Sequence, residues 1–360
     1  MKFRTTSLTP SVVVLLVTGV AMSWTPSAAG GTGSPDHKVV NATFGAAPAS
    51  AKGVDGRPYF VYDTTPGGIN RDHLAVLNIS HKPERLSIYT VDAVPGSNGV
   101  ISFPGRNVKP VQAGAWMSVG TPGGTGVITV KPRSTVILPV HVHVPTNAPP
   151  GDHVGAVIVS LTGEAKAKFG KGGAQRVKFE QRIAVRSEFR VTGPLHPNLT
   201  IQNLDAAFSG ALDPFAKGEA TVTYEVHNDG NVVLGGPQAV TIHGLFGEDV
   251  AAKRLVDLPP LLPGATYGPV IVRVKGIYPE VGMKATVTVH PAGLQGQVTP
   301  NVPVVSASVH FLAIPWVILI ALLLVLLWLL LLFLRRRRRK RLNVAPTGRR
   351  RLEPTAQGAD

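Results

Sequence analysis

Two histidines two positions apart are the first side chains whose spacing suggests chemistry. His141 and His143 lie in an alternating segment, residues 139–145, between two prolines. Successive side chains of a strand point to opposite faces, so both imidazoles lie on one face, as a two-histidine metal site requires. No carboxylate third ligand stands near them in the sequence. The competing interpretation is a strand whose polar face holds two histidines by chance.

A second candidate is the unbroken alternation from Arg176 to Val191, whose even positions present five cations and two acids. A basic stripe on an outer sheet can hold an anionic polymer such as teichoic acid, or the peptide carboxylates of peptidoglycan. The alternative is a solvated face on which Glu180 and Glu188 pair with their neighbours. That face carries no aromatic side chains to stack on bases, which argues against nucleic acid. The five cations are Arg176, Lys178, Arg182, Arg186 and Arg190.

Enzymatic signatures are absent from the sequence. It contains no Gly-x-Ser-x-Gly elbow, no His-Glu-x-x-His pair and no phosphate-binding glycine loop. It also contains no cysteine, which excludes thiol catalysis, zinc–thiolate sites and disulfides. We therefore predict a protein that is not an enzyme and that has no cofactor.

Both ends of the chain indicate export and anchoring. Lys2 and Arg4 precede an apolar stretch, Val12–Met22, and small residues at Ser27-Ala28-Ala29 suit a cleavage site, so residues 1–29 read as a signal peptide. The apolar run 311–334 exceeds the roughly 20 residues that a transmembrane helix needs. The cations at 335–341 should stay inside the cell, which predicts a single-pass cell-membrane protein with an extracellular N-terminal part.

The exterior is expected to consist of strands. Thr221–His227 and Ala285–His290 alternate with a period of two, and Gly/Pro turns recur at short intervals. This pattern predicts an all-β fold with two tandem immunoglobulin-like β-sandwich domains, followed by one C-terminal transmembrane helix. The expected parts are a signal peptide (1–29), a flexible N-terminus (30–37), a first sandwich (38–192), a second sandwich (193–291), a stalk (292–310), the transmembrane helix (311–334) and a basic cytoplasmic tail (335–360).

Several short sequence motifs in the predicted first sandwich resemble those of a known family. Residues 59–93 read YFVYDTTPGGINRDHLAVLNISHKPERLSIYTVDA, and Gly114-Ala115-Trp116, Val144-Pro145 and Pro150-Gly151-Asp152-His153 follow in order. Over about residues 39–192 the chain resembles the N-terminal peptidoglycan-binding domain of the WxL-interacting protein family of Gram-positive cell-surface proteins, as an actinobacterial-type member. The resemblance implies a surface protein of the cell wall, and it transfers no catalytic residue.

The motif residues also have a physical interpretation. Asn78 and Asp92 stand at strand ends, where such side chains satisfy backbone groups. The apolar and aromatic members are expected in the core, namely Tyr59, Tyr62, Leu74, Val76, Leu86, Ile88 and Trp116.

Two functions follow as hypotheses. In the first, the distal sandwich of a non-enzymatic, membrane-anchored protein binds peptidoglycan or another cell-wall polymer. In the alternative, the two sandwiches form an extracellular scaffold that holds a secreted surface protein at the membrane, for instance by accepting a strand at an exposed sheet edge.

Overall fold

A computed structural model of the chain describes residues 43–168, 174–210, 216–294, 302–314 and 316–342. The predicted signal peptide (1–29) and flexible N-terminus (30–37) lie outside these residues, as does the tail beyond 342. All the strands described below belong to one compact unit of the chain, Ala42–Asp360.

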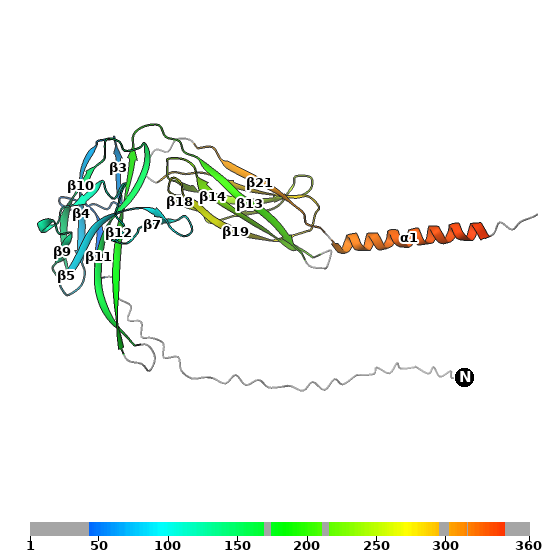
Figure 1. The fold of residues 1–360 in the computed structure, drawn as a ribbon, viewed down its shortest axis with the longest axis horizontal. Helices are drawn as coiled ribbons and strands as arrows, with labels where there is room; N and C mark the ends of the chain where they lie inside the picture. Colours follow the sequence, from blue (N-terminus) through cyan, green and yellow to red (C-terminus); the bar gives the residue numbers. More distant parts are fainter. Residues whose placement is uncertain (1–42, 169–173, 211–215, 295–301, 315, 343–360) are drawn as a thin grey trace, which may run out of the picture. The chain divides into compact units, whose positions relative to one another are not determined.

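The first sandwich consists of two five-stranded sheets (Figure 1). One sheet has the order β2 (Gly53–Val54), β1 (Phe44–Ser50), β4 (Ile69–Asn78), β10 (Ser134–His143) and β8 (Met117–Val119). The other has the order β3 (Phe60–Thr64), β12 (Ala174–Val191), β11 (Gly151–Lys168), β5 (Glu84–Asp92) and β9 (Val127–Val130). A short ribbon of β6 (Val94–Pro95) and β7 (Ile101–Ser102) and a 3-10 turn, η1 (Pro122–Gly124), lie in its connections.

The first core forms because the strands alternate, so that every second side chain faces the opposing sheet. Aromatic rings fill its centre: Tyr62 stacks on Phe189 at 5.0 Å between ring centroids, and Trp116 meets Phe189 edge-on at 5.5 Å. Six of the expected core residues are buried there, namely Tyr62, Leu74, Val76, Leu86, Ile88 and Trp116. Tyr59 differs, because it is half-buried and lines a cavity described below.

The second sandwich has a core of its own, built around residues such as Tyr224, Ile242 and Met283. One sheet has the order β13 (Leu199–Ser209), β14 (Gly218–Asn228) and β19 (Thr266–Ile277). The other has the order β17 (Asp249–Arg254), β16 (Gln238–His243), β20 (Met283–Val289) and β21 (Val305–Phe311). A two-stranded sheet joins β15 (Leu234–Gly236) to β18 (Leu258–Leu261). The predicted class, two tandem immunoglobulin-like β-sandwiches, is thus what the chain adopts.

In each sandwich, a buried asparagine at the end of a strand binds backbone groups of the turn that follows. Asn78 ends β4, and its side-chain amide donates to the carbonyls of Lys82 at 2.8 Å and Val130 at 2.9 Å. Asn228 ends β14, and its amide donates to the carbonyls of Val232 and Leu261, both at 2.9 Å. In each case the amide oxygen accepts the N–H two residues on. Both asparagines are buried, so they fix the turn after the strand as the sequence predicts for Asn78.

The C-terminal end of the second sandwich differs from the prediction. Residues 292–310 were expected to form a stalk, yet β21 pairs with β20 from Val305↔Val289 to Phe311↔Met283. The alternation of Val305, Ala307 and Val309 explains the strand, because these side chains turn toward the core. The second sandwich therefore continues past 291 to Phe311, which the prediction had assigned to the membrane span.

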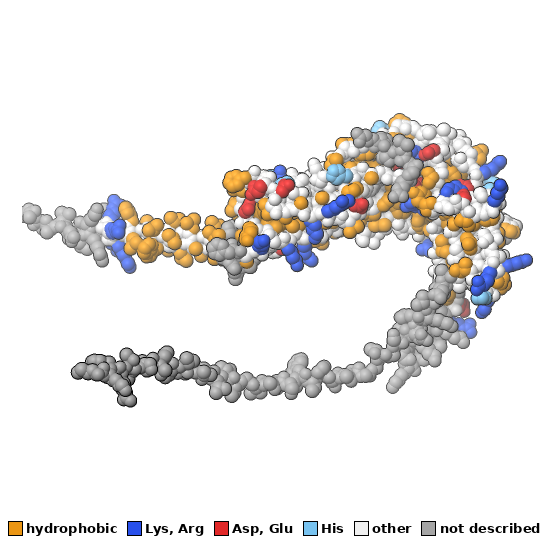
Figure 2. Space-filling model, turned by 180° about the vertical axis from the view of Figure 1, so that it is seen from behind, with side chains coloured by type: hydrophobic (Ala, Val, Ile, Leu, Met, Phe, Trp, Pro, Cys, Tyr) orange, Lys and Arg blue, Asp and Glu red, His pale blue; other side chains and the backbone are white. Residues whose placement is uncertain are grey.

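The helix α1 (Trp316–Leu342) follows directly. Its stretch Val317–Arg338 is long and apolar enough to cross a membrane, and none of it is buried against the rest of the protein. Figure 2 shows an apolar rod with cations gathered at its far end, and these cations belong to the last turns of α1. The helix therefore begins five residues later than the predicted span at 311, because Phe311 and Ala313 are buried in the second core.

Candidate functional site

The strands β11 and β12 form a hairpin that extends beyond its sheet. They pair along their whole length, from Gly151↔Val191 to Lys168↔Ala174. Their outer neighbours cover only the base: β5 pairs with residues 155–160 of β11, and β3 pairs with residues 187–191 of β12. Within the described parts of the chain, no strand pairs with residues 174–180 on the side away from β11. We call residues 174–180 the outer edge of β12, and Figure 1 shows the hairpin running past the other strands.

The predicted basic stripe is exposed only along the outer half of β12. Arg176, Lys178 and Arg182 are exposed. Arg176 lies 3.9 Å from Glu164, an exposed acid on β11, and Arg182 donates to the carbonyl of Pro104 at 3.0 Å. Glu180 is exposed on the same face, so the acids offset much of the positive charge. This face is therefore a mixed surface with a small excess of cations.

Arg190 does not belong to that surface, contrary to the prediction. Its Nε and Nη2 donate to the two carboxylate oxygens of Asp152 at 2.7 and 2.8 Å, and both residues are buried. Asp152 also accepts the backbone N–H of Val233 at 2.9 Å, and its own N–H donates to the carbonyl of Asn231 at 2.8 Å. The pair thus joins the base of the hairpin to the second sandwich, which covers this part of the stripe.

Arg186 is also held by contacts within the protein. Its Nε lies 2.8 Å from a carboxylate oxygen of Glu188, and its guanidinium stacks over the ring of Tyr59 at 4.4 Å. Glu188 is fully buried, and neither of its oxygens accepts an aligned hydrogen bond within the described structure. Burial raises the pKa of Glu188 to about 7, against the opposing effect of the Arg186 charge. The Glu188 carboxyl is thus poised to change its charge near neutral pH.

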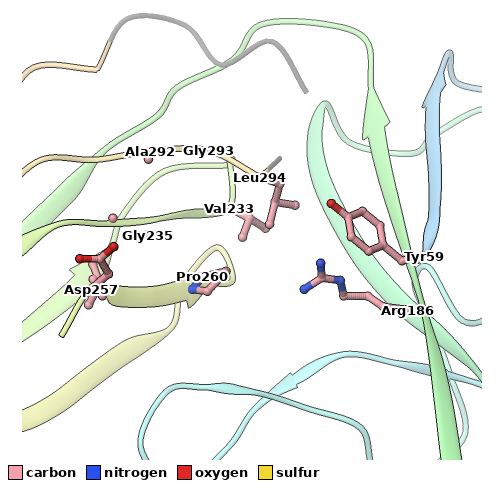
Figure 3. Close-up of a pocket in the computed structure, with 11 residues that line it drawn as sticks. Tyr59, Arg186, Val233, Gly235, Asp257, Pro260, Ala292, Gly293 and Leu294 are labelled. Carbon is pink, nitrogen blue, oxygen red and sulfur yellow. The ribbon is translucent and has the colours of Figure 1, made fainter. Parts of the chain in front are cut away.

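Arg186 and Tyr59 also line a cavity of about 330 Å³. Figure 3 shows them facing Val233, Pro260 and Leu294 of the second sandwich. The rest of the lining comes from Asp257 and from small or apolar residues, namely Gly235, Gly236, Leu258, Ala292 and Gly293. The cavity thus has a cation and an aromatic ring on one wall and mainly apolar groups on the other. The ionised form of Glu188 offsets the Arg186 charge, and Asp257 adds an acid to the lining, so the cavity offers little excess charge to a ligand.

His141 and His143 share one exposed face of β10, as the alternation predicts. Across the sheet, His141 lies opposite Arg71 of β4, and His143 lies opposite Ile69. A neighbouring guanidinium disfavours a metal cation. No group of three or more metal-ligating side chains occurs in the part of the chain that the structure describes. The two-histidine metal site therefore stays a prediction without a third ligand.

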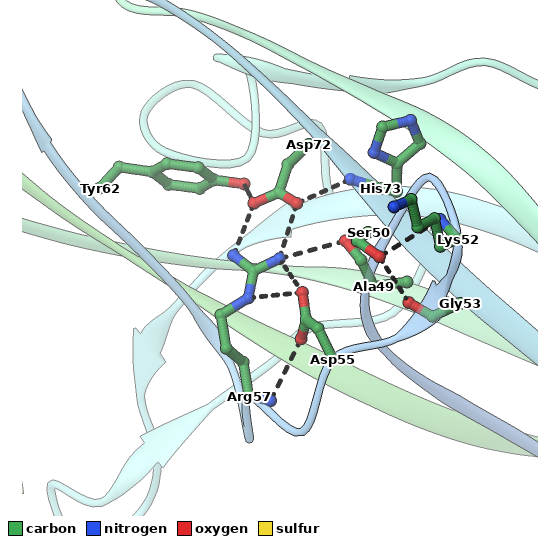
Figure 4. A network of polar contacts seen from close by, with 9 residues as sticks. All are labelled: Ala49, Ser50, Lys52, Gly53, Asp55, Arg57, Tyr62, Asp72 and His73. Atoms are coloured by element: carbon green, nitrogen blue, oxygen red, sulfur yellow. Dashed lines mark hydrogen bonds and ion pairs between the residues drawn. The ribbon is translucent and has the colours of Figure 1, made fainter.

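The sequence analysis did not predict a network of hydrogen bonds around Arg57. Arg57 donates to Asp72 through Nη1 and Nη2, both at 2.8 Å, to Asp55 through Nη2 at 2.7 Å, and to the carbonyl of Ala49 at 3.1 Å (Figure 4). Tyr62 donates to Asp72 at 3.3 Å. The hydrogen bonds that Arg57 donates to Asp72 and Asp55 raise the pKa of Arg57, while burial and Asp72 raise the pKa of Tyr62. Because two carboxylates hold the guanidinium, this network secures the edge of the sheet.

Among the comparisons with known proteins, only the one with solved structures finds similar chains, and the similarity is one of fold. No family model matches the chain, and no curated protein matches it. It is similar to the class 5 fimbriae chaperone CfaA, with 12% identity over 76% of this chain and 99% of that chain and a TM-score of 0.35. The Pseudomonas aeruginosa CupB2 chaperone shares 12% identity over 72% and 99% of the chains, with a TM-score of 0.28. A chain of the Salmonella enterica SafA pilin–SafB chaperone complex shares 11% over 75% and 96%, with a TM-score of 0.30.

Proposed function

We propose that this chain is a non-enzymatic, membrane-anchored binding protein that holds an extended segment of a partner protein along the outer edge of β12. The observation that carries the proposal is the open main-chain edge at residues 174–180 among the described residues. Edge strands present backbone donors and acceptors that a further strand can pair with. A seven-residue edge offers as many positions as an average strand of about 5–6 residues.

The side chains of this edge indicate the chemistry of the partner. Arg176 and Lys178 stand on one face, and Val177 and Phe179 stand on the other. Like charges directly opposite one another destabilise a strand pair, whereas opposite charges stabilise it by roughly 0.2–1 kcal/mol. Pairing with a second copy would bring cations against cations. A partner strand that alternates acidic and apolar residues is complementary to both faces.

The anchor in this proposal is α1. Its stretch without charged side chains, Val317–Leu334, contains 18 residues and spans about 27 Å as a helix, which is close to a hydrocarbon core of about 30 Å. The cations that follow favour the orientation with the sandwiches outside the cell and the tail in the cytoplasm. The hairpin is then presented at the cell surface.

Hydrogen exchange on the full chain in detergent micelles tests the strand-addition proposal. A peptide of alternating Glu and Val should slow amide exchange at 174–180, and a Lys/Val peptide of equal length should not. The double variant R176E/K178E should reverse this preference. Lys131→Glu, an exposed cation between β9 and β10, is the matched control and should leave it unchanged. Unchanged exchange at 174–180 with both peptides would refute the proposal.

An anionic cell-wall polymer is the second candidate ligand. The exposed cations Arg176, Lys178 and Arg182 favour it, and so does the resemblance to the WxL-interacting proteins. Co-sedimentation of the detergent-solubilised chain with insoluble cell wall tests it, and the triple variant R176A/K178A/R182A should be released from the pellet. Sedimentation no greater than that of an unrelated secreted β-sandwich would exclude polymer binding while leaving strand addition intact.

A further inference from the structure

One end of the second sandwich carries exposed apolar loops. The turn between β16 and β17 covers residues 244–248, and the loop between β19 and β20 covers residues 278–282. The sheet register places His243 opposite Lys284, and Lys284 opposite His310. Both loops and the C-terminal exit of β21 therefore lie at the same end of the four-stranded sheet.

The side chains at this end are unusually exposed for their type. Phe246 is 91% exposed, Leu245 is 56% exposed, and Tyr278 and Val281 are each 50% exposed. Leu312, just after β21, is 62% exposed. Such a cluster of large apolar residues on one end of a domain marks an interaction site, whereas single exposed residues do not. We call these five residues the apolar tip.

One hydrogen bond joins the two loops of the apolar tip, and a second lies within the first loop. The backbone N–H of Leu245 donates to Glu280 of the neighbouring loop at 3.3 Å, and the N–H of Phe246 donates to Glu248 at 3.1 Å. Lys217 lies 5.2 Å from the ring centroid of Tyr278. The tip therefore presents apolar groups at its surface, two carboxylates hold the N–H groups of Leu245 and Phe246, and a cation stands beside Tyr278.

The chain itself fixes how far the tip can lie from α1. Phe311 and Ala313 are buried in the second core, and α1 begins at Trp316. Three residue steps span at most about 11 Å when fully extended. If α1 crosses a bilayer from Val317 onward, the end of the sandwich that carries the apolar tip must lie at the surface of that bilayer.

We propose that the apolar tip inserts into the interfacial layer of the membrane beside α1. The ligand is the lipid surface: aromatic rings such as Phe246 and Tyr278 favour the headgroup boundary, and apolar side chains gain from leaving water. Lys217 lies beside Tyr278, where it can meet lipid phosphates. The second sandwich is then held to the membrane by two contacts, the helix and the tip, which restricts its tilt. This inference rests on the membrane anchoring in the proposed function.

Single-cysteine labelling tests the proposal, because the chain has no cysteine of its own. The full chain is reconstituted in phosphatidylcholine vesicles with an environment-sensitive dye at Phe246→Cys or, in a second variant, Tyr278→Cys. Val256→Cys is the matched control, because Val256 is an apolar residue with 88% exposure near the opposite end of the same sandwich. Leu324→Cys, in the middle of α1, reports anchoring.

The expected result is blue-shifted emission at 246 and 278 that lipids with a headgroup-level nitroxide quench, with neither effect at 256. The dye at 324 should be quenched by a nitroxide deep in the acyl chains. Lipid-like emission at 324 with water-like emission at both 246 and 278 would overturn the tip insertion and leave the anchoring standing. Water-like emission at 324 would overturn the anchoring and the tip insertion with it.

Discussion

Replacing Arg190 with methionine should destabilise the protein strongly, because Asp152 would stay behind as a buried carboxylate. Asp152 is 4% exposed and accepts three hydrogen bonds, two from Arg190 at 2.7 and 2.8 Å and one from the N–H of Val233 at 2.9 Å. Removing one partner of a buried ion pair costs about 3–5 kcal/mol. With a urea dependence of about 2–3 kcal/mol/M, the unfolding midpoint should fall by roughly 1–2.5 M.

Urea titration of the full chain in detergent micelles measures this shift, followed by the fluorescence of the buried Trp116 in a W24F/W316F/W328F background. The double variant D152L/R190M removes both charges and leaves the Val233 N–H without its acceptor, which costs about 1–3 kcal/mol. It should therefore be more stable than R190M alone. Arg182→Met is the matched control, because Arg182 is exposed and should change stability by no more than about 0.5 kcal/mol.

An R190M midpoint that coincides with that of R182M would refute the stranded charge at Asp152. A double variant as unstable as the single one would refute it too, because the cost would then come from lost packing of the Arg190 side chain. A stranded charge is the one source of instability that the second substitution relieves.

Three further outcomes are expected. Glu188→Gln should raise the melting temperature above pH 7 and change it little at pH 5. Burial raises the pKa of Glu188 from 4.5 to about 7, so the stability that the protonated Glu188 contributes is present below pH 4.5 and is lost, by at most about 3 kcal/mol, as pH rises through 7. A variant whose stability falls with pH as steeply as that of the original chain would contradict this. Asn78→Ala and Asn228→Ala should each lower the free energy of unfolding by about 2–4 kcal/mol in urea, because two carbonyls lose their donor, whereas the exposed Asn107→Ala should be neutral. External protease on wall-stripped cells should digest the sandwiches and spare a C-terminal tag, because the cations at 335–341 favour a cytoplasmic tail. Digestion of the tag in sealed cells would contradict this orientation.

The strands were predictable because burial imposes a local period of two. The alternation at Thr221–His227 lies within β14, and that at Arg176–Val191 fills β12 to within two residues. Asn78 and Asp92 were also placed correctly at strand ends: Asp92 accepts the N–H groups of three residues that lie about twenty positions later in the chain. That Asp92 would bind backbone groups could be inferred from its type, but which groups it binds depends on the tertiary fold.

The end of the second sandwich was misjudged because two local signals overlap at Phe311. This residue closes an alternating segment, Val305–Phe311, and also opens the apolar run that leads into the span. A run of hydropathy cannot show whether an apolar side chain faces a protein core or lipid. The pairing of β21 with β20 decides it, and that pairing joins segments separated by more than a dozen residues.

The basic stripe shows that an alternating sequence does not determine which side chains are exposed. The alternation puts the five cations on one face of β12, but it cannot show what covers that face. The second sandwich and Tyr59 lie over Arg190 and Arg186, whereas Arg176 and Lys178 remain exposed. One strand thus has two physical environments: at its base, charge pairs are buried and fixed, and at its outer edge, the main chain is open among the described residues. Under the strand-addition proposal, a partner strand would add to an outer edge that is already paired with β11 along its length, which would lower the entropic cost of binding.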